Sequence, residues 1–297
     1  MVIKKITLSA LLCILSISLL RSDAFIFDLG GVLIDTNYYA SFLTLGPLNI
    51  AQYMLHERKG PKKINTHIKN TLFSILDKTA HLSQLSCTHN TTTSQACDET
   101  GVPLPFLMQA WLNGSISCHD IRLLTLTSIE EHPEWFSCAA EKRLVRNSIQ
   151  MIFDPKIFIK TRKLYHDGLS FIRSCKKHGH SVFILSNWDS ESFPLLQNAY
   201  PELFNLCDGI VISGNVNATK PSCEIYAHLL DQYSLDPQYC WFIDDQKENI
   251  VTAQEELGIN SILCPRKRGT KRPDFIELYR IYKRQMLSQI NNPTRKT

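Results

Sequence analysis

The stretch FIFDLGGVLID, residues 25–35, is a short apolar run that ends at Asp28 and leads into the glycine pair Gly30 and Gly31. An apolar run of this length, stopped by glycines, predicts a buried strand followed by a tight turn. Four further apolar runs occur in the second half of the chain: SVFILSN (181–187), DGIVIS (208–213), CWFIDD (240–245) and SILC (261–264). Helical segments are expected between them, at 222–234 and 247–257. This alternation predicts an α/β fold built on a doubly wound parallel sheet with helices on both faces.

The first strand is far from the others in the sequence. About 120 mostly helical residues separate them, which is too long for an ordinary connection. Ile64, Ile68, Leu72 and Ile75 within this stretch have the spacing of one helix face. We therefore predict an inserted helical cap domain. The expected organisation is a leader at 1–24, an α/β core formed by 25–37 and 156–264, a helical cap at 38–155 and a basic tail at 265–297.

The composition is that of an ordinary globular protein. Of the 297 residues, 44% are hydrophobic and 20% are charged, which excludes a wholly disordered chain and a multi-span membrane protein. The net charge of +4 is too small to indicate a specific nucleic-acid binder. Residues 265–297 hold ten Lys and Arg residues and only two acidic residues. We expect a solvated tail there, with weak contact to anionic surfaces as the alternative.

The amino terminus has the features of an export signal. Lys4 and Lys5 precede an uncharged run at 6–20, and Ser22 and Ala24 match a small-x-small cleavage pattern. We expect cleavage after Ala24 and an exported, periplasmic or secreted protein. An uncleaved membrane anchor is the alternative, favoured by the strand that begins directly at Phe25.

Polar residues recur where the apolar runs end. Asp28 ends the first run, Ser186 and Asn187 end the second, and Asp244 and Asp245 end another. Ligands of open parallel sheets bind outside the carboxyl ends of the strands, so these groups are expected to converge. Clustered carboxylates repel one another unless a cation lies among them, and an all-oxygen site suits Mg²⁺. Lys220 follows another strand and could supply positive charge for an anionic substrate.

These residues resemble the four motifs of haloacid dehalogenase (HAD) superfamily hydrolases with a helical cap, in the family's order over residues 25–264. The resemblance implies a Rossmann-like core. FDLGGVLID resembles the first motif and LSN the second, with Asp28 as nucleophile and Ser186 as a phosphate-binding residue. SGNVNATKPSCEIY resembles the third, with Lys220 as its lysine, and FIDDQKENI the fourth, with Asp244 and Asp245 as its acidic pair. WLNGSIS resembles a cap stretch of phosphatase-like relatives.

The resemblance implies a mechanism in which Asp28 attacks phosphorus and forms an aspartyl-phosphate that water hydrolyses. It also implies that Mg²⁺ is held by Asp28, the backbone carbonyl of Gly30 and Asp245. Asp244 either reaches the metal through water or orients Lys220.

The phosphoryl oxygens are expected to be held by Ser186, the Asn187 backbone and Lys220.

Two positions depart from the family pattern. Phosphatases of this family usually carry a second Asp two residues after the nucleophile, as general acid and base, and here that position is Gly30. General acid catalysis contributes roughly 10²–10⁴-fold, so its loss favours substrates with good leaving groups or an acid supplied by the cap. Asn217 stands where Gly is common, three residues before the lysine. Asn tolerates positive φ better than most residues, so the turn is expected to survive.

The leading functional prediction is a Mg²⁺-dependent phosphomonoesterase acting on a small phosphorylated metabolite. The first alternative is a dehalogenase-type C–X hydrolase that uses the same Asp28. The second alternative is a non-catalytic binding module that kept the fold without the carboxylate usual at position 30. Asp35 and Asp189 lie near the expected mouth of the site and are expected to have structural or capping roles.

Overall fold

The computed structural model describes residues 22–58, 60–83, 95–98 and 101–291. Its central sheet has five parallel strands in the order β5-β4-β1-β6-β7. The central strand β1 pairs with β4 on one side and β6 on the other. The predicted α/β fold class is confirmed. The strands are β1 (Ala24–Phe27), β4 (Ser181–Ser186), β5 (Gly209–Ile212), β6 (Cys240–Asp244) and β7 (Asn260–Leu263).

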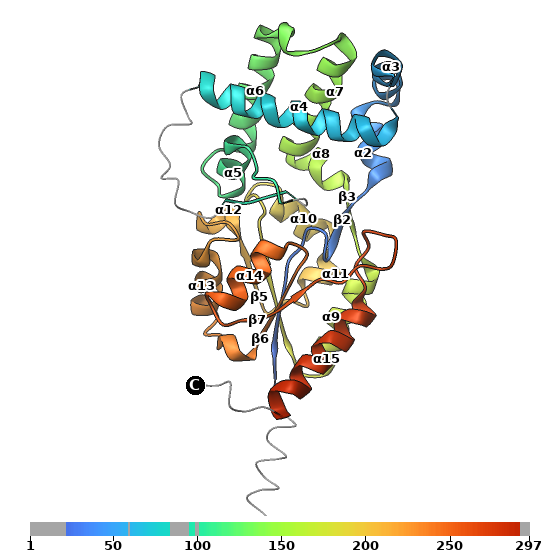
Figure 1. Cartoon of the computed structure of the whole chain (residues 1–297). Helices are drawn as coiled ribbons and strands as arrows, with labels where there is room; N and C mark the ends of the chain where they lie inside the picture. The colour runs from blue at the N-terminus through green and yellow to red at the C-terminus, as the bar shows by residue number, and fades with distance from the viewer. Residues whose placement is uncertain (1–21, 59, 84–94, 99–100, 292–297) are drawn as a thin grey trace, which may run out of the picture.

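Both faces of this sheet are covered by helices (Figure 1). Alternate residues of each strand point to opposite faces, so Phe25 and Phe27 pack in one core while Ile26 packs in the other. The first core is covered by α9 (His166–Lys177), α10 (Phe193–Ala199), α11 (Pro201–Phe204) and α15 (Phe275–Asn291). The second is covered by α13 (Cys223–Gln232) and α14 (Lys247–Glu255). The short α12 (Ser213–Val216) follows β5, and the 3₁₀ turn η3 (Pro237–Tyr239) precedes β6.

The long connection after β1 forms a separate group of helices above the sheet (Figure 1). The chain enters and leaves it through an antiparallel pair of short strands, β2 (Ile34–Thr36) and β3 (Arg162–Leu164). We call residues 38–160 the helical segment. Its elements are α2 (Tyr38–Leu45), α3 (Pro47–Glu57), α4 (Pro61–Leu82), α5 (Phe106–Leu112), α6 (Cys118–Glu131), η2 (Pro133–Trp135), α7 (Ala139–Phe153) and α8 (Pro155–Lys160).

The helical segment has apolar clusters of its own. Leu72 and Ile75 of α4 pack with Trp111 of α5, Ile121 of α6 and Ile149 of α7. Side chains from four helices therefore exclude water together, which explains why the segment forms a distinct layer rather than covering the sheet.

The carboxyl-terminal region differs from the sequence expectation. Residues 265–297 were expected to be a solvated basic tail, but residues 275–291 form α15, and Phe275, Leu278 and Tyr282 are buried against the sheet core. These three residues share one helix face, so an apolar stripe docks the helix although its other faces are basic. The expectation is corrected for residues 265–291, while 292–297 lie outside the described residues.

The expected leader falls almost entirely outside the described residues, which begin at Ser22. Ala24 is the first residue of β1 and is aligned with Ser181 and Cys240 in the neighbouring strands. The buried Asp23 accepts a hydrogen bond from the Tyr282 hydroxyl at 2.9 Å. Cleavage after Ala24 would therefore remove contacts that this fold uses. None of the helices in the described part of the chain has the length and apolar character needed to span a membrane.

Candidate active site

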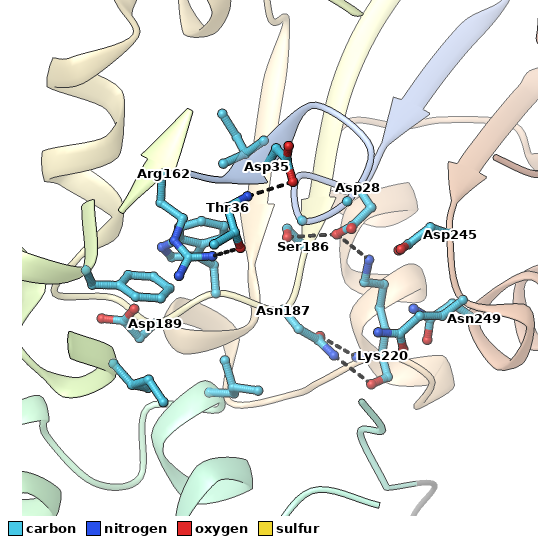
Figure 2. Close-up of a pocket in the computed structure, with 18 of the residues that line it drawn as sticks. Asp28, Asp35, Thr36, Arg162, Ser186, Asn187, Asp189, Lys220, Asp245 and Asn249 are labelled. Atoms are coloured by element: carbon cyan, nitrogen blue, oxygen red, sulfur yellow. Dashed lines mark hydrogen bonds and ion pairs between the residues drawn. The ribbon is translucent and has the colours of Figure 1, made fainter. Parts of the chain in front are cut away.

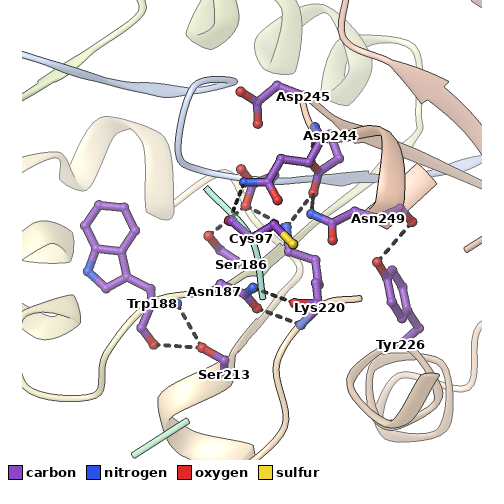
Figure 3. Close-up of polar contacts among 12 residues, drawn as sticks. Cys97, Ser186, Asn187, Trp188, Ser213, Lys220, Tyr226, Asp244, Asp245 and Asn249 are labelled. Atoms are coloured by element: carbon purple, nitrogen blue, oxygen red, sulfur yellow. Dashed lines mark hydrogen bonds and ion pairs between the residues drawn. The ribbon is translucent and has the colours of Figure 1, made fainter. Parts of the chain in front are cut away.

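The residues predicted from the strand ends meet at the carboxyl edge of the sheet, where Figure 3 shows Ser186, Asn187 and Asp244 close to Lys220. Asp28 directly follows β1, Ser186 ends β4 and Asp244 ends β6. Lys220 lies in the loop between α12 and α13 and reaches the same point from the side. The parallel sheet brings them together because the carboxyl ends of all its strands lie at one edge.

Lys220 is the central cation of the cluster, and its side chain is 2% exposed. Its Nζ donates to Asp28 Oδ1 at 2.7 Å and to Asp244 Oδ2 at 2.6 Å. Burial by itself would lower the pKa of Lys220, but the Asp244 and Asp28 carboxylates outweigh burial and raise that pKa above its usual value. Lys220 is therefore held in its charged form.

The two carboxylate oxygens of Asp28 have different hydrogen-bond partners. Ser186 Oγ donates to Asp28 Oδ1 at 2.8 Å, so this oxygen is shared between Ser186 and Lys220. Among the described residues, none donates a hydrogen bond to Asp28 Oδ2. Burial and the neighbouring Asp244 raise the pKa of Asp28, and Lys220 opposes them. One carboxylate oxygen is thus anchored while the other is available to a ligand.

Asp244 has a different environment, because both of its oxygens are used by the protein. Oδ1 accepts from the Gln246 backbone N–H at 2.8 Å, and Oδ2 accepts from Lys220 and from Asn249 Nδ2 at 3.0 Å. Asp244 is fully buried. Protein donors therefore occupy both oxygens of Asp244, and one of these donors is Lys220.

Asn187 fixes the backbone on which Lys220 stands. Its Nδ2 donates to the Lys220 carbonyl at 2.8 Å, and its Oδ1 accepts from the Lys220 N–H at 2.7 Å. Asn217, in the same loop, has φ +55°, so the expected positive φ is confirmed. The side chain of Asn187 therefore clamps the lysine loop, a contact that the sequence did not predict.

Asp245 lies beside this cluster and pairs with a residue that the sequence analysis missed. Arg266 Nη2 donates to Asp245 Oδ2 at 2.6 Å, and Nη1 donates to the Gly31 carbonyl at 2.5 Å. Burial, Asp28 and Asp244 raise the pKa of Asp245 to about 7, although Arg266 opposes the shift. Arg266 was assigned to the solvated tail, but it lies in the loop that follows β7, three residues after the end of the strand. The strand-end rule that selected the other residues could have found it.

The three carboxylates of Asp28, Asp244 and Asp245 form an oxygen cluster suited to a hard cation. One oxygen from each lies within 4.8 Å of the others. Burial raises the pKa values of Asp28 and Asp245, and the neighbouring carboxylates raise them further. Oxygen ligands in close proximity are what Mg²⁺ prefers, so the residues present fit this metal.

The two glycines that follow Asp28, Gly30 and Gly31, are under different constraints. A Cβ built on Gly31 would lie 2.5 Å from Asp245 Oδ2, and φ at this position is +72°, so only glycine fits. A Cβ built on Gly30 would have one neighbour within 4 Å, Asp28 Oδ2 at 3.8 Å. The missing side chain at Gly30 therefore leaves space beside Asp28.

A cavity of about 410 Å³ opens over these residues (Figure 2). Its polar end is formed by the sheet edge, with Asp28, Ser186 and Lys220. The opposite wall is largely apolar and comes from the helical segment and nearby loops. It includes Met108, Trp111, Leu112, Ile152, Phe158 and Trp188.

The two weaker candidates from the sequence also line this cavity. Asp189 is buried, and its Oδ1 accepts from the backbone N–H groups of Glu191 at 3.1 Å and Ser192 at 2.8 Å. Asp35 accepts from the Thr36 N–H at 2.8 Å and pairs with Lys163 at 3.1 Å. Both side chains are engaged locally, as their expected structural roles require.

The chain belongs to the haloacid dehalogenase-like hydrolase family, whose model matches residues 22–255. The chain is 33% identical over 85 residues to the sesquiterpene phosphatase astK of Aspergillus oryzae, a match covering 29% of this chain and 43% of that protein. It is 27% identical over 112 residues to the enolase-phosphatase E1 of a Hydrogenobaculum species, covering 37% of this chain and 49% of that protein. Each match therefore spans less than half the length of the relative.

The fold is similar to that of a HAD family enzyme from Bacteroides thetaiotaomicron, crystallised with magnesium and inorganic phosphate. The two chains are 18% identical with a TM-score of 0.51, and the match covers 87% of this chain and 100% of that one. This likeness extends the shared fold to the helical segment as well as the sheet.

Proposed function

We propose that the protein is a Mg²⁺-dependent phosphomonoesterase that acts on a small phosphorylated metabolite. The observation that carries the proposal is the bonding of Asp28. One oxygen is anchored by Ser186 and Lys220, and the other has no hydrogen bond from the described residues. An anchored carboxylate with one available oxygen, next to a buried lysine, is the arrangement that nucleophilic attack on phosphorus requires.

The proposed reaction has two steps. A carboxylate oxygen of Asp28 attacks phosphorus and the ester P–O bond breaks, which forms an aspartyl-phosphate on Asp28. The bonding electrons leave with the ester oxygen as an alkoxide or phenolate, which then takes a proton from water. Water then hydrolyses this intermediate and releases inorganic phosphate. Ser186 and Lys220 now donate to Asp28, and both can turn to phosphoryl oxygens as negative charge moves onto them.

Asp28 and Asp245, with the Gly30 carbonyl, would hold Mg²⁺ in this proposal. When bound, the ion offsets the repulsion between the Asp28 carboxylate and the phosphate dianion. Arg266 donates to Asp245 Oδ2 and leaves Oδ1 for a ligand. Asp244 orients Lys220 through the 2.6 Å contact to its Nζ.

The absence of a carboxylate at Gly30 restricts which esters turn over well. Gly30 cannot donate a proton to the departing alkoxide, and general acid catalysis is worth roughly 10²–10⁴-fold. We therefore infer a preference for aryl, acyl or anomeric phosphates, whose leaving groups are stable without protonation.

The relatives support the phosphatase activity, and the proposal also covers the helical segment and the amino terminus. Two proteins to which this chain is similar are named as phosphatases, and a structure of the same fold was crystallised with magnesium and phosphate. The helical segment is proposed as the cap that selects the substrate, since it supplies the apolar wall of the cavity. Residues 1–24 are proposed as an export signal or a membrane anchor.

A panel of phosphate esters, assayed with Mg²⁺ and with EDTA, tests this function. We expect phosphate release from aryl and acyl phosphates in Mg²⁺ and its loss in EDTA, with recovery when Mg²⁺ is restored. Turnover of 2-haloacids that persists in EDTA would overturn the proposal in favour of C–X hydrolysis. Binding of a phosphate analogue without turnover of any ester would favour a binding module.

A further inference from the structure

Arg162 is a cation of the same cavity that the proposed mechanism does not use. It is the first residue of β3 and is aligned with Thr36 of β2, at the point where the helical segment rejoins the sheet domain. Its side chain lines the cavity, as Figure 2 shows, together with Asp28, Ser186 and Lys220. A molecule that fills the cavity can therefore contact Arg162 while its phosphate lies at Asp28.

The guanidinium group of Arg162 is only partly satisfied by the protein. Nη1 donates to Thr36 Oγ1 at 3.1 Å and Nη2 donates to Thr161 Oγ1 at 3.3 Å. Nε is buried and makes no hydrogen bond. An arginine has five N–H donors, so three of them lack an acceptor among the described residues. The group lies 4.2 Å from the centre of the Phe158 ring, which fixes its plane.

Arg162 also lacks a carboxylate partner within the described part of the chain, unlike other cations around the cavity. Lys220 pairs with Asp28 and Asp244, and Arg266 pairs with Asp245. The Asp35 carboxylate raises the pKa of Arg162, but Asp35 forms its ion pair with Lys163. Burial lowers the pKa of Arg162 to about 10, so the guanidinium is still charged at neutral pH. A partly buried charge without a carboxylate partner is unfavourable, and an anionic ligand would relieve this.

We propose that Arg162 binds a second anionic group, a carboxylate or a phosphate, carried by the organic part of the substrate. A planar guanidinium with several unused N–H groups suits the two oxygens of such an anion. The inference rests on the proposed phosphatase function and narrows its substrate class. The substrate is a phosphate ester whose leaving group bears a second negative charge, positioned so that one molecule spans from Asp28 to Arg162.

Matched esters test this proposal: phenyl phosphate and its three carboxyphenyl positional isomers. We expect kcat/KM for at least one carboxyphenyl isomer to exceed that for phenyl phosphate by about 10- to 100-fold, the range for hydrogen bonds to charged groups. Arg162→Gln should remove most of this ratio, and Arg162→Lys should restore part of it. Arg146→Gln, on the exposed part of α7, is the matched control and should keep the ratio.

Binding to a protein unable to react separates this proposal from the proposed function. Calorimetry of the Asp28→Asn protein should give tighter binding of the preferred carboxyphenyl phosphate than of phenyl phosphate, and adding Arg162→Gln should abolish the difference. Failure of the wild type to hydrolyse any ester would refute the phosphatase function alone. Equal affinity for all four ligands, or an Arg162→Gln change that weakens all four equally, would overturn the role of Arg162 as an anion site. Thermal unfolding of each variant checks that the fold is kept.

Discussion

Replacing Lys220 with methionine should destabilise the protein strongly, because it leaves two buried carboxylates without their cation. Methionine nearly conserves the volume, so the change removes charge rather than packing. Lys220 is 2% exposed, Asp244 is fully buried, and both ion-pair distances are 2.7 Å or less. Removing one partner of a buried ion pair costs about 3–5 kcal/mol. We expect a loss of that size in the free energy of unfolding at pH 8.

The penalty should depend on pH in a predictable direction. Burial already raises the pKa of Asp28 in the wild type, and loss of Lys220 would remove the charge that opposes this rise and so raise the pKa of Asp28 further. A carboxyl whose pKa is higher in the folded state than in the unfolded state lowers the free energy of unfolding. This effect appears only above about pH 4, where the same carboxyl is ionised in the unfolded chain. The penalty should therefore be smaller at pH 5 than at pH 8. The wild-type contribution of Lys220 is constant over this range, because its raised pKa matters only in alkaline solution.

Urea unfolding at pH 5 and pH 8, followed by circular dichroism and tryptophan fluorescence, measures these differences. The two probes must report coincident transitions for the free energies to be compared. The double variant Lys220→Met/Asp244→Asn should recover part of the loss, since the amide carries no charge. A Lys220→Met protein within about 1 kcal/mol of the parent at pH 8, well below the 3–5 kcal/mol expected for a broken buried pair, would refute the reasoning. A penalty of equal size at both pH values would also refute it.

Three other changes test the site and the fold. Asp28→Asn should abolish ester turnover while circular dichroism stays unchanged, because the amide is not a nucleophile; retained turnover would exclude the aspartyl-phosphate route. In the wild type we expect kcat/KM for aryl phosphates to exceed that for alkyl phosphates by roughly 10²–10⁴-fold. Gly30→Asp should reduce this ratio, because the structure has space for a Cβ at this position. An unchanged ratio would place the proton donor elsewhere. Leu278→Ala, 1% exposed in α15, should lower the free energy of unfolding by about 2–5 kcal/mol in urea. The exposed Ile276→Ala is its control, and equal effects would mean that α15 does not dock through this face.

Local sequence patterns predicted the strands of the sheet and the residues at their ends. Short apolar runs bounded by turn residues are typical of buried strands, and their length and their alternation with helical stretches made β4 and β6 identifiable. Asp28, Ser186 and Asp244 were identifiable because a polar residue at the end of such a run has a defined place at the sheet edge. These inferences use neighbours in the sequence and one topological rule.

The sequence analysis failed where a residue's role depends on distant partners. α15 lies in a basic stretch that resembles a solvated tail, and only the packing of Phe275, Leu278 and Tyr282 against the sheet places it in the fold. The short strands β2 and β3 are far apart in the sequence: the hydrogen bond between Thr36 and Arg162 joins residues that are 126 positions apart. Neither strand has a pattern strong enough to be identified alone.

The sequence by itself therefore determined that the chain forms this parallel sheet and that Asp28, Ser186, Asp244 and Asp245 stand where its strands end. The tertiary structure decided how their charges are distributed: Asp28 and Asp244 share Lys220, while Asp245 has Arg266. It also left Arg162 without a carboxylate among the described residues, in a cavity between two layers. The physical reason is that pairing and burial of charges depend on distances across the fold, and electrostatic energies in a protein interior change steeply with both distance and burial.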